Sequence, residues 1–153
     1  MFTMRPAPGE CGAYFVRYVA CIGDGEWQAR LDAQPADYRA LLAGVDDDTA
    51  ALPLAPGKWS LLDVMGHVAD TERVFAFRLL WFARGDGAPL PGFDQDAWAS
   101  QTAGHPRTLA GLLDDFEAVR HSTLTLLRGL PDEVADRRGA RPGRALVVGE
   151  DGV

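Results

Sequence analysis

The chain has 153 residues, 47% of them hydrophobic and 24% charged, and a formal net charge of −7. This length suits one domain with a proper core, and the composition is ordinary for a soluble globular protein. The acidic balance argues against binding of nucleic acid, which requires a basic surface patch. No apolar run is long enough to span a membrane, and the segment MFTMRPAPGE lacks the apolar core of a signal peptide. We therefore expect a cytoplasmic protein with no membrane partner.

The first third of the chain predicts two helices after an extended lead-in over residues 1–9. The first helix covers residues 10–22 and ends before the break Gly23–Gly25. The second covers residues 26–43, with Pro35 expected to kink or restart it. The acidic run Asp46–Asp48 lacks the glycine and glutamate of a calcium-binding EF-hand loop, so it is interpreted as a solvated turn.

The third predicted helix has the clearest pattern. Ser60 is an N-cap residue, and Asp63 three positions later completes a capping-box-like arrangement. Apolar residues then recur at helical spacing, at Leu61, Val64, Met65, Val68, Phe75, Leu79 and Phe82. Gly85 and Gly87 end the helix, and the long loop that follows suggests a functional edge.

The last predicted helix begins near Thr108 and ends at Gly129, with Pro131 just beyond. Its apolar ridge consists of Leu109, Leu112, Leu113, Phe116, Thr123, Leu127 and Leu130. Residues 138–153 show no pattern of a packed element. The chain is therefore predicted to be one all-α domain over residues 1–153, with antiparallel helices joined by short and medium loops.

Two charged residues interrupt the apolar faces of these helices. Glu72 lies within the apolar arc of the third helix, and Arg120 lies in the middle of the ridge of the last one. Buried charges are costly unless they are paired, so we predict an ion pair between Glu72 and Arg120 across the helix interface. The sharper alternative is that Glu72 acts as a general base.

His67 is the best candidate for a metal ligand, although a lone histidine on a helix is more often a hydrogen-bonded packing residue. Asp63 and Asp70, one turn to either side, could orient its ring or join it around a cation. His121 points away from the apolar ridge and is expected to be exposed. His105 lies in the loop before Pro106, and no histidine pair has the spacing of a metal-binding motif.

Three segments of the chain carry a family resemblance. They are PGKWSLLDVMGHVADTERVFAFRLLWFARGD, LPGFDQDAW and LAGLLDDFEAVRHSTLTLLRGLPDEVADRRG. In this order they closely resemble the DinB/YfiT-like superfamily, in the branch with a PGKWS–GHxxDxER–FR signature, over roughly residues 8–139. The resemblance implies a four-helix bundle, often dimeric, with a divalent metal held by three histidines. It also implies metal-dependent hydrolysis, or transfer with a low-molecular-weight thiol.

The correspondence with the family site is partial. The first metal-binding histidine matches His67, while Glu72 and Arg78 match the ER–FR pattern. Residues Phe93, Asp94 and Trp98 match the loop at the rim of the site. The two remaining histidines of the family lie on a final helix, in a GHxxHH-type segment that this chain lacks. Three explanations stay open: a truncated chain, a reading frame that diverges after about Gly139, or a variant that has lost the site.

The leading hypothesis is therefore a DinB-like hydrolase or thiol transferase with an incomplete site. In it, His67 would bind zinc or nickel, and Glu72 or Asp70 would assist proton transfer to or from a small-molecule substrate. The alternative is a non-catalytic, self-associating bundle that binds a small ligand or a protein partner. Without the last helix one apolar seam of the bundle is exposed, and we expect the tail or a second chain, in a homodimer, to cover it.

Overall fold

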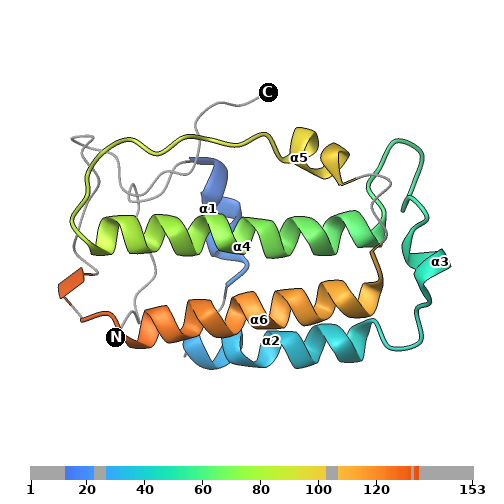
Figure 1. Ribbon diagram of the computed structural model, residues 1–153, viewed down its shortest axis with the longest axis horizontal. Coiled ribbons are helices and arrows are strands. Elements are labelled where there is room, and N and C mark those ends of the chain that lie inside the picture. The colour runs from blue at the N-terminus through green and yellow to red at the C-terminus, as the bar shows by residue number, and fades with distance from the viewer. Residues whose placement is uncertain (1–12, 23–26, 103–106, 132, 135–153) are drawn as a thin grey trace.

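A computed structural model of the chain describes residues 13–22, 27–102, 107–131 and 133–134. These residues form six helices and no strand. Three long helices, α2 (Trp27–Leu41), α4 (Leu61–Ala83) and α6 (Leu109–Arg128), lie along one another, and the short α1 (Ala13–Ala20) runs across them (Figure 1). Two more short helices, α3 (Asp47–Ala50) and α5 (Gln95–Gln101), lie in the connections. The all-helical prediction is confirmed, and the last predicted helix corresponds to α6, whereas the lead-in over residues 1–9 and the tail over residues 138–153 lie outside the described residues.

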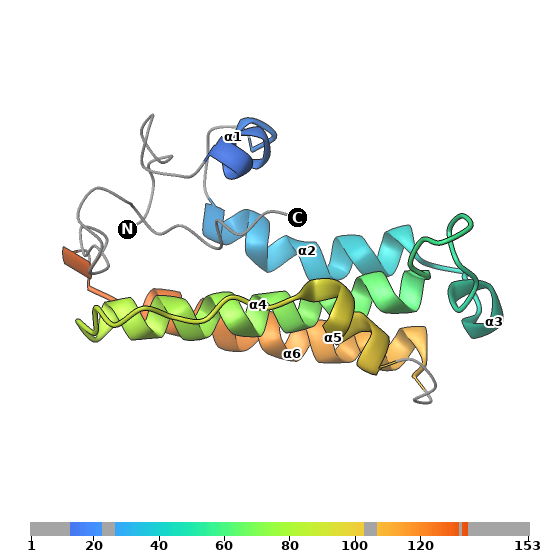
Figure 2. The same ribbon diagram turned by 90° about the horizontal axis from the view of Figure 1, so that it is seen from above.

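Helices α4 and α6 run parallel to each other. Asp63 near the start of α4 pairs with Arg107 just before α6, and Arg73 further along α4 pairs with Asp115. The paired residues therefore advance together along both helices. A parallel neighbour requires a long return connection, and the segment between α4 and α6 runs back over α4 to supply it (Figure 2).

Helix α2 runs antiparallel to α6, as predicted. Arg39 near the end of α2 pairs with Asp114 near the start of α6, whereas Asp32 pairs with Arg128 at the end of α6. The antiparallel arrangement expected from the sequence thus holds for α2 but not between α4 and α6.

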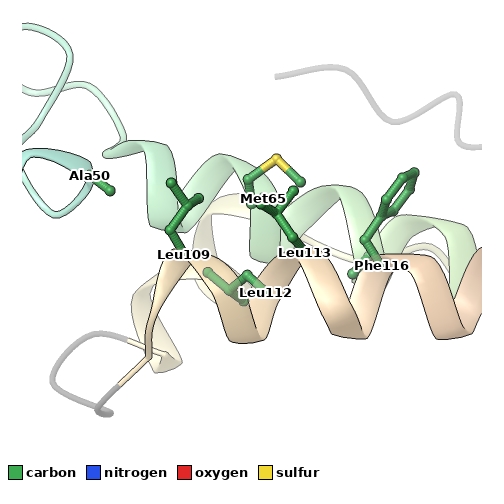
Figure 3. Close-up of a cluster of buried hydrophobic side chains, with 7 residues drawn as sticks. Ala50, Met65, Leu109, Leu112, Leu113 and Phe116 are labelled. Atoms are coloured by element: carbon green, nitrogen blue, oxygen red, sulfur yellow. The ribbon is translucent and has the colours of Figure 1, made fainter. Parts of the chain in front are cut away.

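The core lies between α4 and α6 and is closed at one end by α3 (Figure 3). Phe116 is fully buried, and Met65 of α4 packs with it in the same cluster. The other buried members are small or aliphatic: Ala50, Ala69, Leu109, Leu112 and Leu113. The first four residues of the ridge predicted on the last helix, Leu109 to Phe116, are buried as expected. Further along, the prediction is wrong in part, because Thr123, Leu127 and Leu130 are only partly buried and Leu124, which it omitted, is buried.

Pro35 lies inside α2, which continues through it, so of the two predicted effects the restart of the helix is wrong. A proline inside a helix lacks the N–H that would bond the carbonyl four residues earlier, which here belongs to Leu31. That carbonyl instead accepts a hydrogen bond of 2.7 Å from Nη1 of Arg120. The neighbouring helix therefore satisfies the group that Pro35 leaves without a partner, and α2 continues to Leu41.

The acidic run at 46–48 is more ordered than the solvated turn that was predicted. The side chain of Asp46 caps the one-turn helix α3 by accepting from the N–H of Thr49. Asp47 Oδ1 accepts a 2.7 Å hydrogen bond from the backbone N–H of Leu109, the first residue of α6. Since the first N–H groups of a helix have no partner within it, Asp47 joins α3 to the start of α6.

Helix α5 lies in the segment that was predicted to be a loop. Asp94 caps it by accepting from the backbone N–H groups of Asp96 and Ala97. The capping residue and an acidic first turn were the available sequence signals. The helix lies against α4, and its Trp98 lines a cleft between α5 and α4.

Candidate functional site

The PGKWS segment is a turn that delivers two side chains to the start of α4. Gly57 has φ of 71°, as the third residue of a type II turn requires, and the N–H of Lys58 donates to Ala55 O at 2.9 Å. The turn leaves Trp59 against the ring of His67, with ring centroids 5.0 Å apart in an edge-on contact. Ser60 follows as the N-cap of α4.

The predicted capping box is confirmed. The N–H of Asp63 donates to Ser60 Oγ at 3.1 Å, and the N–H of Ser60 donates to Asp63 Oδ2 at 3.0 Å. Asp63 also accepts from Arg107 at 3.1 Å. Burial raises the pKa of this carboxyl, but the hydrogen bonds from Ser60 and the charge of Arg107 outweigh that effect and hold its pKa below the usual value.

His67 is half-buried and only weakly held through its nitrogens. Thr71 Oγ1 lies 3.4 Å from each ring nitrogen, which is long for a hydrogen bond. Neither Asp63 nor Asp70 bonds to the ring, because Asp63 is held by Ser60 and Arg107 and Asp70 lies 3.5 Å from Arg73. The packing of His67 on Trp59 therefore fixes the ring while leaving its nitrogens able to bind a ligand.

Glu72 and Arg120 form the ion pair that the sequence predicted. Both Glu72 carboxylate oxygens accept from Arg120, at 2.7 Å each, and the two side chains are only 11% and 8% exposed. Arg120 also donates to Leu31 O at 2.7 Å and to Gln34 Oε1 at 2.5 Å. One guanidinium thus joins α2, α4 and α6, and Glu72 could act as a base only if this pair opened.

Three other residues of the GHxxDxER–FR signature, Gly66, Arg73 and Arg78, also help to hold the bundle together. A Cβ atom at Gly66 would lie 2.5 Å from Arg107 Nη1, so the glycine makes room for the guanidinium that bonds Asp63. Arg73 bonds Asp115 across to α6. Arg78 Nη2 donates to Pro91 O at 2.8 Å, which fastens the return connection to α4.

A cleft of about 390 Å³ lies between the second half of α4 and this return connection. Asp70 and Arg78 line it, on the same side of α4 as His67, since residues three, seven and eleven positions apart share a helical face. The remaining lining is almost wholly apolar, with Phe93 and Trp98 on the far wall. Of the residues predicted for the site, the structure thus brings together Asp70, Arg78, Phe93 and Trp98, whereas His67 and Glu72 do not line the cleft. Asp94 caps α5 instead.

The described residues do not make a complete metal centre. Among them, no group of three or more His, Cys, Asp or Glu side chains is arranged to hold a metal ion. A catalytic metal needs about three protein ligands and an open position. His121 is exposed on α6, as predicted, and His105 lies outside the described residues.

The family model for the DinB superfamily matches residues 30–152. The chain belongs to the DinB superfamily. The match covers most of the chain and extends beyond residue 139, where the resemblance carried by the sequence motifs ends.

Two curated relatives are each named "putative metal-dependent hydrolase". One, from Geobacillus kaustophilus, is 30% identical over 74 residues, which cover 48% of this chain and 42% of the relative. The other, from Geobacillus thermodenitrificans, is 25% identical over 127 residues, covering 80% of this chain and 71% of the relative. The chain thus spans less than half the length of the first relative.

The fold is similar to that of YfiT from Bacillus subtilis, described as a probable metal-dependent hydrolase with an unusual four-helix bundle topology. The TM-score is 0.66 at 22% identity, over 76% of this chain and 66% of YfiT. At this identity the similarity establishes the helical-bundle fold of the DinB-like domain. None of the helices in the described part is long and apolar enough to cross a membrane.

Proposed function

We propose that this DinB-like domain serves metal-dependent hydrolysis and that His67 is the metal ligand contributed by α4. The proposal is supported by membership of the DinB superfamily, by the names of the two Geobacillus relatives, and by the geometry of His67. Its ring is fixed by Trp59 and has no hydrogen bond of ordinary length among the described residues. An imidazole ligand suits zinc or nickel, and we propose one of these as the cation.

The cation would need about three protein ligands, and among the described residues no three candidate side chains are grouped to supply them. Asp70 is the better of the two candidate bases, since it lines the cleft and is 42% exposed. Glu72 is committed to Arg120. Transfer of a low-molecular-weight thiol, the second activity implied by the family resemblance, would use the same cleft.

A second candidate function is non-catalytic binding of a small ligand or a protein partner. It is favoured by the ion pairs of Asp63 and Glu72, which leave His67 without a carboxylate partner. The cleft needs no metal to accept a ligand, so this function would survive the loss of the family's metal chemistry.

Metal content distinguishes the two candidates. Purified protein is dialysed against zinc or nickel at equal concentrations, and bound metal is measured by mass spectrometry for the unmodified chain, His67→Ala and His121→Ala. His121 is the matched control, because it is an exposed histidine on α6. The first proposal expects metal in the unmodified chain and in His121→Ala and its loss in His67→Ala. A protein that takes up no metal would support the second candidate, and metal retained in His67→Ala would contradict the proposal that His67 is the ligand.

We also propose that the protein is a cytoplasmic homodimer. Two apolar side chains three positions apart on α4 support the dimer, because Phe77 and Leu80 share a helical face and are 51% and 36% exposed. Exposed apolar side chains gathered on one helix mark an association surface. Light scattering after size exclusion tests it: a dimer is expected, and a monomer at all concentrations would contradict the proposal.

A further inference from the structure

The buried guanidinium of Arg78 has one nitrogen without a partner. Arg78 is 6% exposed, and its Nη1 is one of two buried side-chain nitrogens in the described part of the chain that lack a hydrogen bond; the other is Trp81 Nε1. Its Nη2 bonds Pro91 O, so the guanidinium is already held in place. A buried donor without an acceptor is costly, and such atoms call for an explanation.

The surroundings of Arg78 leave it without a counter-ion. The rings of Phe75 and Phe93 lie 5.7 and 6.0 Å from its central carbon. Burial lowers the pKa of Arg78, with no carboxylate raising it. An arginine stays charged in proteins, so the charge at this position is balanced by nothing that the described residues provide.

The other charged groups that line the cleft compensate one another. Asp70 lies 3.5 Å from Arg73, which also bonds Asp115. Asp70 precedes Arg78 by eight residues, which is about 12 Å along a helix axis. The cleft therefore has an uncompensated positive end at Arg78 and a nearly neutral end at Asp70, joined by an apolar floor that includes Val74 and Phe77.

The walls of the cleft suit a flat apolar group. Trp98 is 44% exposed and Phe77 is 51% exposed, and both line the cleft. Phe93 packs on Trp98 with ring centroids 4.7 Å apart, so the far wall is a pair of aromatic rings. The volume, about 390 Å³, is in the range of pockets that bind small molecules, roughly 300–1,000 Å³.

We propose that this cleft binds a small aromatic carboxylate, whose anionic end accepts a hydrogen bond from Arg78 and whose ring lies between Phe77 and Trp98. The planar fork of an arginine matches a carboxylate, and the charge-assisted bond is strongest where water is excluded. The inference rests on the cleft alone and not on the proposed metal chemistry.

The test uses 2-naphthoate and its uncharged amide as probes, with the full chain kept metal-free by a chelator. Isothermal titration calorimetry is expected to show the carboxylate binding roughly ten- to hundred-fold more tightly than the amide, the gain typical of a hydrogen bond to a charged group. Arg78→Met should abolish this difference by weakening only the carboxylate. The matched control, Arg84→Met, alters an exposed arginine just beyond the helix and should change neither affinity.

Trp98→Ala provides an independent variant, because an exposed side chain can be removed without opening the core. It should weaken both probes by a similar factor while the preference for the carboxylate persists. If Arg78→Met does not fold, the preference in the unmodified chain and the Trp98→Ala result decide. Equal binding of the two probes, no binding of either, or an unchanged preference in folded Arg78→Met would overturn the proposal. Since no metal is present, failure here leaves the His67 proposal standing.

Discussion

Replacing Arg120 by methionine tests whether the three long helices depend on one buried guanidinium. The substitution keeps an apolar side chain of similar length but removes the bonds to both Glu72 oxygens, to Leu31 O and to Gln34 Oε1. It leaves the Glu72 carboxylate nearly buried and without its partner.

The expected cost is large compared with the stability of such a domain. Removing one partner of a buried ion pair costs about 3–5 kcal/mol. The free energy of unfolding of a native domain is only about 5–15 kcal/mol. When both charges are removed, in Glu72→Leu with Arg120→Met, no charge stays buried, and the cost should fall well below the sum of the two single changes. Most of the cost of each single variant is therefore attributed to the charge left behind.

Urea unfolding followed by circular dichroism and tryptophan fluorescence measures these values for the unmodified chain, both single variants and the double variant. The matched control is Arg73→Met. Arg73 forms an ion pair with Asp115, and these two side chains are 47% and 42% exposed. The free energy of unfolding should therefore fall by about 1 kcal/mol or less. A cost below about 1 kcal/mol for Arg120→Met, or single costs that simply add in the double variant, would refute the reasoning.

Three further predictions concern other parts of the fold. Gly57→Ala places a residue with a side chain at a φ of 71°, and this strain should lower the free energy of unfolding by about 1 kcal/mol. The melting temperature should fall by about 2–4 °C, and an unchanged melting temperature would contradict the assigned turn. Asp63 has a lowered pKa in the folded state, so the unfolded chain binds its proton first as the pH falls. The stability that Asp63 contributes is therefore full above its unfolded pKa of about 3.9 and lost as the pH falls through the folded value. Asp63→Asn should flatten the acid limb of the stability curve, and an unaltered limb would argue against the contribution. Pro35→Ala should stabilise α2 by clearly less than the ~3 kcal/mol typical of a proline inside a helix, because the freed Leu31 carbonyl is already bonded to Arg120; a full gain in urea unfolding would contradict that account.

Local sequence chemistry predicted the features that depend on neighbours along the chain. The capping box at Ser60 and Asp63 needs only residues three positions apart. The pairing of Glu72 with Arg120 is long-range, but it followed from the cost of a buried charge, which leaves few alternatives once both helices are placed. Such inferences succeed because one strong energetic term dominates.

Features that depend on two distant segments could not be predicted in the same way. The parallel course of α4 and α6 is set by how the return connection lies on α4, through contacts such as Arg78 with Pro91. The continuity of α2 across Pro35 depends on Arg120, which is far away in the sequence. The use of Asp47 at the start of α6 likewise needs both segments in place.

The cleft was only partly predictable. The family resemblance indicated that Phe93 and Trp98 lie at the rim of the site, and both line the cleft. The unpaired charge of Arg78 could not be inferred, since nothing in the sequence says that its neighbours carry no counter-ion. That feature appears only when packing has placed Asp70 beside Arg73 and Asp94 at the cap of α5.

The family signature separates into a structural part and a part free for chemistry. Gly66 leaves room for Arg107, which lies just before α6. Glu72 and Arg73 form ion pairs with Arg120 and Asp115 of α6. These roles would be needed in a bundle of this form whether or not it binds a metal. Only His67 and Asp70 have no strong bond that the fold requires. A chain can therefore keep nearly the whole signature for packing reasons after its metal chemistry is gone. The signature alone identifies the bundle, and the metal test of His67→Ala addresses the separate question of whether the bundle is an enzyme.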